Sequence, residues 1–109
     1  MVSVIENNIG LIAAVCRKRN VKALYLFGSA ARATDFTENS DLDFLVEFNY
    51  KDKTDDSNLF ERVENADTLK AELMKITNRD IDLVQERNIE NKFLKYFINK
   101  EKKLVYGLS

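Results

Sequence analysis

The sequence predicts an α/β fold of the α+β type, a small mixed sheet of at least three strands with helices packed on it. Three short runs, at 23–27, 41–48 and 79–84, are rich in branched or aromatic residues and too short for helices, which is typical of strands. Longer segments with apolar residues at helical spacing lie around them. The 109 residues suffice for one domain, expected to span residues 1–109.

The composition excludes several classes of protein. Hydrophobic residues make up 45% and charged residues 32% of the chain, as in an ordinary globular protein. The net charge of −1 provides no general attraction to nucleic acid or membranes. The chain has no apolar run of about eighteen residues, and residues 1–20 lack the features of a signal peptide. We therefore expect a cytoplasmic protein.

Cysteine and histidine usage narrows the chemistry further. Cys16 is the single cysteine and the chain has no histidine, so an internal disulfide, a Cys/His catalytic pair and a zinc site are excluded. Cys16 lies on the apolar side of a predicted helix and is expected to be a buried structural thiol. Any general base must be a carboxylate, a lysine or a tyrosine.

The first predicted helix runs from Ser3 to about Asn20 and is expected to pack against the sheet. Ser3 and Glu6 have the spacing of a capping box. Basic residues at 17–19 complement the helix dipole at its C-terminal end. The apolar positions recur at helical spacing, namely Val4, Ile5, Ile9, Ile12, Val15 and Cys16.

The next stretch predicts a phosphate-binding turn. Residues 23–27 form a buried strand that ends at Gly28 and Ser29. Glycine permits positive φ and close approach of another group, and the serine hydroxyl can cap a helix and hydrogen-bond a phosphate oxygen. A short helix then begins at 30–32, and a helix N-terminus favours an anion. Taken alone, Gly-Ser after a strand is most often just a turn.

The second strand, residues 41–48, carries a pair of carboxylates on one face. Because side chains alternate along a strand, Asp41 and Asp43 project in parallel, with Cα atoms roughly 6.6 Å apart. Two convergent carboxylates favour a hard cation that takes oxygen ligands. Asp-Xaa-Asp alone is more often a solvated edge, but its combination with the preceding Gly-Ser turn is much more specific.

The remainder predicts a loop, a helix, a strand and a last helix. Polar residues 49–58 are a loop, and a helix from about 57–76 carries an apolar stripe expected in the core, part of which could instead meet a partner. In strand 79–84, Asp80 and Asp82 share a face. A basic helix at about 89–104 is expected to present a solvated face, with Tyr106 and Leu108 packed on it.

The spacing of these residues resembles the active-site motif of the DNA polymerase beta-like nucleotidyltransferases, and the short chain is similar to their minimal members. The matching residues are the Gly28-Ser29 pair, the Asp41-Xaa-Asp43 motif after it, and Arg32. The resemblance implies a polymerase beta-like core in which Gly28, Ser29 and Arg32 bind the nucleotide. It implies that Asp41 and Asp43 are catalytic and ligate two Mg²⁺ ions.

The resemblance also implies a third catalytic and metal-binding carboxylate, a reaction and a partner. Asp82 is the matching third residue, with Asp80 as its competitor. The implied activity is Mg²⁺-dependent transfer of AMP from ATP to a hydroxyl, a tyrosine of a HEPN-domain toxin, in an antitoxin role. Two alternatives remain: a catalytically idle subunit that inhibits its partner by contact, and a nucleotidyltransferase acting on a small molecule or an RNA end.

Overall fold

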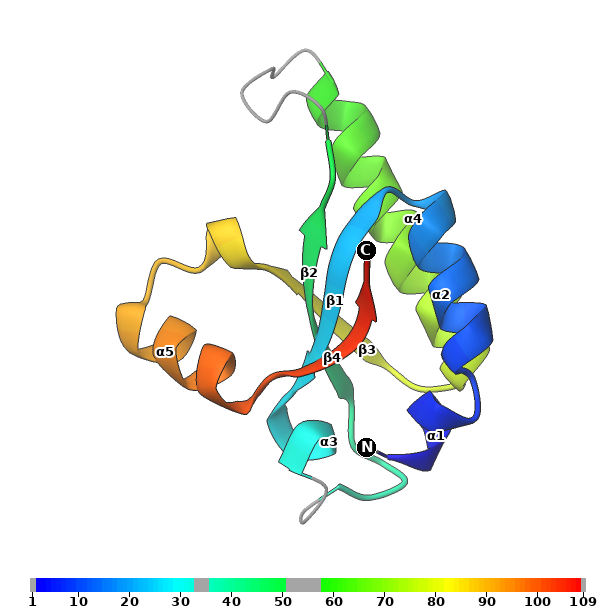
Figure 1. Cartoon of the computed structure of the whole chain (residues 1–109), viewed down its shortest axis with the longest axis vertical. Helices are drawn as coiled ribbons and strands as arrows, with labels where there is room; N and C mark the ends of the chain where they lie inside the picture. The colour runs from blue at the N-terminus through cyan, green and yellow to red at the C-terminus, as the bar shows by residue number, and fades with distance from the viewer. Residues whose placement is uncertain (1, 33–35, 51–57, 109) are drawn as a thin grey trace.

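The structure, a computed structural model, describes residues 2–32, 36–50 and 58–108, and within them it has a four-stranded mixed sheet with helices around it (Figure 1). The predicted fold class is confirmed. The elements in chain order are α1 Ser3–Glu6, α2 Ile9–Lys18, β1 Val21–Phe27, α3 Gly28–Arg32, β2 Leu42–Phe48, α4 Leu59–Thr77, β3 Ile81–Gln85, the 3₁₀ turn η2 Glu86–Asn88, α5 Lys92–Glu101 and β4 Lys103–Gly107.

The strand order β3-β2-β1-β4 brings the ends of three strands together at one end of the sheet. β1 runs antiparallel to β2 and places Phe27 opposite Asp43. β3 runs parallel to β2 and places Asp82 opposite Asp43. The C-terminal end of β1 therefore lies beside the N-terminal ends of β2 and β3, and the residues at these three ends form the region in which the sequence predicts a site.

The core lies between the sheet and the pair of helices α2 and α4, which also contact each other (Figure 1). Leu42, Phe44 and Val46 alternate along β2 and are 0–1% exposed, as the period of two predicts. Burying a side chain of this kind contributes about 1.5–3 kcal/mol each. Other members of the cluster are Ile12, Cys16, Leu24, Leu26, Leu69 and Leu73.

The prediction of one continuous first helix is wrong, because the structure divides this segment into two helices, α1 and α2. The Asn8 side-chain amide donates to the Val4 carbonyl over 2.7 Å, and that carbonyl is the one a continuous helix would pair with the Asn8 backbone N–H. The capping box is also wrong. Ser3 is the first residue inside α1, Val2 is its N-cap, and no side chain caps the helix.

The prediction for the last part of the chain is also wrong. The predicted helix at 89–104 is shorter, and Lys103–Gly107 forms β4 on the free edge of β1. Lys102 has an extended backbone (φ −58°, ψ 142°) that ends α5. Tyr106 is buried opposite Leu24 in the sheet instead of packing on the helix, and Leu108 is exposed.

The apolar stripe of α4 is only partly in the core. Leu69 and Leu73 are fully buried, but the first turns of the helix leave Leu59, Phe60 and Val63 exposed. The predicted loop 49–58 and the predicted helix start near residue 57 fall mostly on 51–57, which lie outside the described residues. Within the described ranges, no helix is both long and apolar enough to cross a bilayer.

Cys16 is expected to be unreactive in the folded protein. Its side chain is fully buried, and burial raises the pKa of the thiol to about 12 despite the opposing charge of Arg17. Because the thiolate is the nucleophile, native protein at about pH 8 should not react with a disulfide reagent such as DTNB, whereas urea-unfolded protein should react completely. Equal labelling rates for the two states would contradict the buried position.

Candidate active site

Three carboxylates lie near one another where β2 and β3 begin. Asp43 is half-buried in β2, and Asp82 of β3 lies opposite it in the parallel ladder, where neighbouring strands run about 4.8 Å apart. Asp41 is exposed and immediately precedes β2. The strand pairing thus joins the Asp-Xaa-Asp motif to a carboxylate that is 39 residues later than Asp43 in the chain.

The closeness of the three carboxylates affects the ionisation of Asp43. Its pKa is raised above 3.8, first by burial and then by the negative charges of Asp82 and Asp41, while the positive charge of Arg32 lowers it. The site therefore gathers negative charge that the side chains around it offset only in part. A cation placed among the carboxylates would relieve this repulsion.

The oxygen donors fit a hard divalent cation such as Mg²⁺, which prefers carboxylate ligands. The carboxylates do not yet form a closed metal site. Within residues 2–32, 36–50 and 58–108, no three acidic, Cys or His side chains lie close enough together to hold a metal ion. Asp41 and Asp82 are both exposed, so their side chains have room to turn toward a shared ion. The Asp43 carboxylate, half-buried on its strand, is the least exposed of the three donors.

Gly28 packs directly against the Asp43 carboxylate. It has φ of 71°, in the left-handed region that favours glycine, and a Cβ at this position would overlap Asp43 Oδ2. The helix α3 begins at Gly28 itself, so Ser29 lies in its first turn and is not the residue preceding it. The Gly-Ser turn and the carboxylates are therefore parts of one local arrangement.

Arg32, the last residue of α3, connects the site to α5. Its Nη1 donates to both carboxylate oxygens of Glu101, over 3.0 and 3.2 Å. The same guanidinium lowers the pKa of Asp43, so it lies between the carboxylate cluster and the end of α5. The pair is partly exposed, with 44% of the Arg32 side chain and 33% of the Glu101 side chain accessible. Exposed pairs of this kind contribute only about 0–1 kcal/mol.

Asp80 and Asp82, the two candidates for the third carboxylate, have different surroundings in the structure. Asp80 precedes β3, its carbonyl accepts from the Leu42 N–H, and its side chain lines a polar pocket of about 340 Å³ together with Asp41 and Asn78. Asp80 is not among the groups that raise the pKa of Asp43, whereas Asp82 is. Asp82 is therefore the carboxylate of this pair that acts on Asp43.

Two residues that position the site are not recognisable from the sequence. One is Glu101, described above. The other is Arg79, whose Nη1 donates to the carbonyls of Thr37, Glu38 and Ser40 over 2.9–3.2 Å and whose guanidinium stacks on Phe36. Arg79 thereby holds the segment that leads into Asp41. Both contacts join residues about 40 or more positions apart, and no local pattern reports such a contact.

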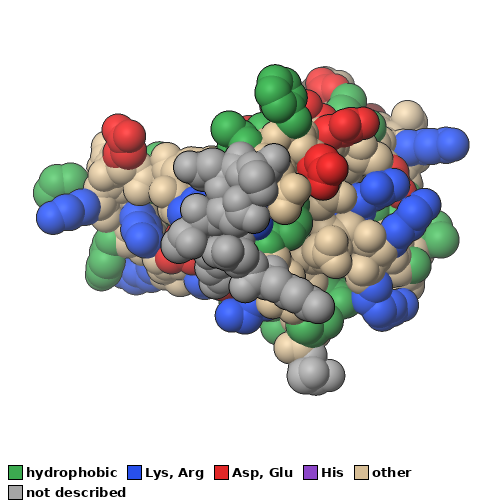
Figure 2. All heavy atoms as spheres, turned by 90° about the horizontal axis from the view of Figure 1, so that it is seen from above, with side chains coloured by type: hydrophobic (Ala, Val, Ile, Leu, Met, Phe, Trp, Pro, Cys, Tyr) green, Lys and Arg blue, Asp and Glu red, His purple; other side chains and the backbone are tan. Residues whose placement is uncertain are grey.

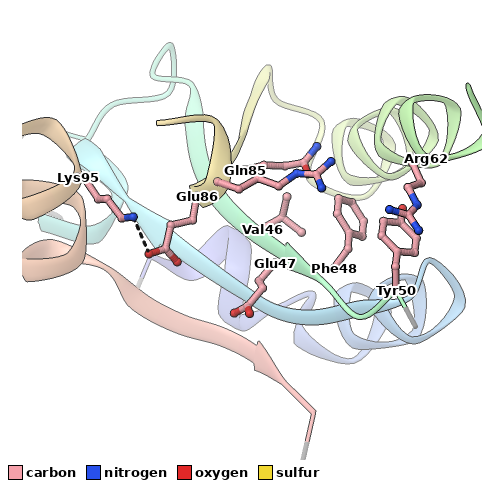
Figure 3. Close-up of a pocket in the computed structure, with 9 residues that line it drawn as sticks. Val46, Glu47, Phe48, Tyr50, Arg62, Gln85, Glu86 and Lys95 are labelled. Carbon is pink, nitrogen blue, oxygen red and sulfur yellow. Dashed lines mark ion pairs between the residues drawn. The ribbon is translucent and has the colours of Figure 1, made fainter. Parts of the chain in front are cut away.

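A second pocket, of about 300 Å³, lies toward the other end of β2 (Figure 3). Phe48 stacks on Tyr50 with ring centroids 5.3 Å apart, and Arg62 lies over the Tyr50 ring. Lys95 of α5 pairs with Glu86 of η2 at the opposite side of the pocket (Figure 3). Phe48 is five residues beyond Asp43, or roughly 16 Å along the strand, so this pocket does not include the predicted site residues.

Comparison with known proteins gives matches that cover most of the chain. The family model described as polymerase beta, nucleotidyltransferase matches residues 11–109. A protein of Methanocaldococcus jannaschii, provisionally named a protein adenylyltransferase, is 36% identical over 89 residues, which are 82% of this chain and 79% of that protein.

Two solved structures share the fold. A toxin-antitoxin crystal structure with AMP-PNP contains a chain that is 25% identical, with a TM-score of 0.66, over 94% of this chain and 75% of that one. A structure of the tri-AMPylated Shewanella oneidensis HEPN toxin in complex with an MNT antitoxin gives a TM-score of 0.61 at 22% identity, over 95% of this chain and 73% of that one. At this identity the second match establishes likeness of fold alone.

Proposed function

The chain belongs to the polymerase beta nucleotidyltransferase family, and from this premise we propose that it transfers AMP from ATP to a hydroxyl group on a protein. The observation that carries the proposal is the half-buried Asp43, which faces Asp82 across the β2–β3 ladder and has a raised pKa. Such a cluster of charge beside a Gly-Ser turn is suited to phosphoryl chemistry, in which positioning and charge neutralisation do most of the work.

Asp41, Asp43 and Asp82 are the proposed ligands of two Mg²⁺ ions. When bound, such a pair of metals neutralises charge on the transferred phosphoryl group and lowers the pKa of the attacking hydroxyl. Asp43 is two residues from Asp41 on one side and opposite Asp82 in the β2–β3 ladder on the other, so it would be the central donor of the proposed ligand set. This arrangement also accounts for a site that contains no histidine.

The remaining proposed contacts hold the nucleotide. The Gly28 N–H and the Ser29 hydroxyl donate to phosphate oxygens, and Arg32, which lies beside Asp43, pairs with a phosphate. The acceptor hydroxyl oxygen then forms a bond to the α-phosphorus. The bond from the α-phosphorus to the oxygen bridging it to the β-phosphate breaks, pyrophosphate leaves, and the hydroxyl proton passes to water.

The proposed acceptor is a tyrosine hydroxyl of a HEPN-domain toxin, so that the chain acts as an antitoxin. Support comes from its relatives: one is provisionally named a protein adenylyltransferase, and a toxin-antitoxin structure of the same fold contains AMP-PNP. A further structure of the same fold joins an MNT antitoxin to a tri-AMPylated HEPN toxin. Use of ATP as donor places the proposed reaction in the cytoplasm.

The proposal is tested with ATP labelled on the α-phosphate. Purified protein, Mg²⁺ and labelled ATP are added to lysate from a host that lacks this gene, with a sample containing EDTA as the control. We expect a labelled protein band that requires Mg²⁺, and mass spectrometry should find AMP on a tyrosine. Label confined to RNA or to small molecules would replace the proposed acceptor. No label in any fraction would favour a subunit that acts by contact alone.

The two candidate third carboxylates are separated by a matched pair of variants. Asp82→Asn should lower the rate of AMP transfer at least about tenfold, because removing one ligand forfeits part of the several kcal/mol that a metal contributes. Asp80→Asn removes the same charge two residues away and should retain the rate of the wild type, because Asp80 does not act on Asp43. Equal losses in both variants would contradict the assignment of Asp82.

A further inference from the structure

Helix α5 presents an aromatic surface to solvent. Phe93, Tyr96 and Phe97 are 79%, 61% and 56% exposed, and we name these three residues the α5 ridge. Tyr96 and Phe97 follow Phe93 by three and four positions, and residues at these spacings lie on the same side of a helix, so the three rings form one continuous strip. The edges of Tyr96 and Phe97 meet, with ring centroids 5.5 Å apart.

The α5 ridge exposes a large apolar area to solvent. Within the described part of the chain, Ile98 is the one buried residue of α5. Since an aromatic side chain has roughly 200 Å² of surface, the ridge leaves on the order of 400 Å² open to solvent. This is comparable to the largest patch on a typical monomer, and about half of what one partner contributes to a standard protein interface.

Basic side chains surround the ridge. Lys92 and Lys100 flank it on α5, and Lys103 follows at the start of β4; all three are exposed. Viewed from above, hydrophobic side chains and several Lys or Arg side chains, with an acidic side chain among them, are interspersed at the left-hand end of the molecule, which is the end where Figure 1 places α5 (Figure 2). A surface of this kind is complementary to an apolar groove that is edged by acidic side chains.

The ridge also lies close to the candidate active site. Glu101 follows Phe97 by one helical turn, or about 6 Å, on the same side of α5. Glu101 in turn binds Arg32, whose charge acts on Asp43. A protein seated on the ridge is therefore near enough to bring a side chain to the carboxylates.

We propose that the α5 ridge is the docking surface for the acceptor protein, which covers it with an apolar groove edged by acidic residues. The proposal rests on the proposed function, because it identifies where the acceptor of AMP is held. A rival surface, the exposed Leu59, Phe60 and Val63, is on the first turns of α4. In Figure 1 that end of α4 lies at the opposite end of the molecule from α3, so a protein docked there is distant from the carboxylates.

The test compares a ridge variant with a matched control in the transfer assay. The acceptor is the protein that labelled ATP identifies, purified and titrated against each variant. Phe93→Ser combined with Phe97→Ser should raise the KM for the acceptor about thirtyfold or more, because buried aromatic anchors dominate interfaces. The kcat and the affinity for AMP-PNP should be unchanged. Phe60→Ser, which removes a still more exposed ring from α4, should leave all three quantities unchanged.

A charge variant tests the acidic edge of the partner. Lys100→Glu should raise the KM for the acceptor at least about threefold at low salt, and the difference from the wild type should shrink as salt screens it. An unchanged KM in the ridge variant, or a larger rise for Phe60→Ser, would overturn the docking surface while leaving AMP transfer intact. If no protein is labelled by the wild type, the proposed function fails and the docking surface fails with it.

Discussion

Replacing Asp43 by Asn is expected to lower the rate of AMP transfer about a thousandfold, the largest effect of any single substitution in the site. Asp43 is half-buried, lies two residues from Asp41 and faces Asp82 in the β2–β3 ladder, so it would be the central donor of the proposed metal ligands. Removing its charge forfeits several kcal/mol of metal-dependent stabilisation of the transition state, and about 4 kcal/mol corresponds to a thousandfold. The measurement is a single-turnover assay with labelled ATP and saturating acceptor.

The same variant should be more stable than the wild type when metal is absent. Because the pKa of Asp43 is raised above 3.8 in the folded protein, its ionisation opposes folding; the penalty is absent below about pH 3.8 and complete above the raised pKa. Asp43→Asn lacks this penalty at neutral pH. Urea unfolding in EDTA should therefore show a higher free energy of unfolding for the variant, and a weaker dependence of stability on pH.

Added Mg²⁺ should reverse that order. An ion that binds the folded state alone stabilises it, so the melting temperature of the wild type should rise with Mg²⁺ concentration while that of Asp43→Asn stays nearly constant. Two results would count against the role of Asp43. One is a variant that keeps a tenth or more of the wild-type rate, and the other is equal stabilisation of both proteins by Mg²⁺.

Gly28→Ala is expected to cost both activity and stability. Gly28 has φ of 71°, and an added Cβ would overlap the Asp43 carboxylate. The backbone strain alone amounts to about 1–2 kcal/mol. Relief of the overlap requires Asp43 or the turn to move by roughly an ångström, and a displacement of that size at a reacting centre can cost about a hundredfold in rate. Both losses are measured, by urea unfolding and by the transfer assay.

Gly10→Ala is the matched control for this substitution. Gly10 lies in the first turn of α2, and nothing lies within 4 Å of an added Cβ. Because alanine favours a helix more than glycine does, Gly10→Ala should raise the free energy of unfolding by up to about 1 kcal/mol and leave the transfer rate unchanged. If Gly28→Ala behaves like Gly10→Ala, then the Gly-Ser turn does not position Asp43.

Whether a predicted element is correct depends on whether its cause is local in the sequence, and this explains both the correct strand β2 and the errors at the two ends of the chain. Alternation along 41–48 is a local property, because the pleat of a strand places every second side chain on the same face, and this pattern correctly predicts β2. β4 has no such signal of its own: residues 103–107 form a strand because β1 offers them a free edge. At the break between α1 and α2, the Asn8 side chain takes the Val4 carbonyl that a continuous helix would use, and apolar periodicity does not indicate such a bond.

For the helices, too, the sequence pattern predicts the element but not how it packs. Helical spacing correctly predicts that α4 and α5 form, but it does not tell which apolar residues become buried. Ile98 is the one apolar residue of α5 that is buried, and the α5 ridge stays exposed to solvent. A periodic apolar face indicates a surface that can be buried, and whether this chain or another protein buries it depends on what packs against the helix.

The sequence by itself determined the fold class, the family, and the set of candidate side chains, because Gly28, Ser29, Asp41 and Asp43 are placed by short-range spacing along one turn and one strand. The tertiary structure decided how distant groups reach them. It places Asp82, which the family resemblance had implied, opposite Asp43, and it adds two contacts that no sequence pattern indicated: Arg32 binds Glu101, and Arg79 binds the segment before Asp41. These contacts follow from strand order and helix packing, which depend on the free energy of the whole fold rather than on any local pattern.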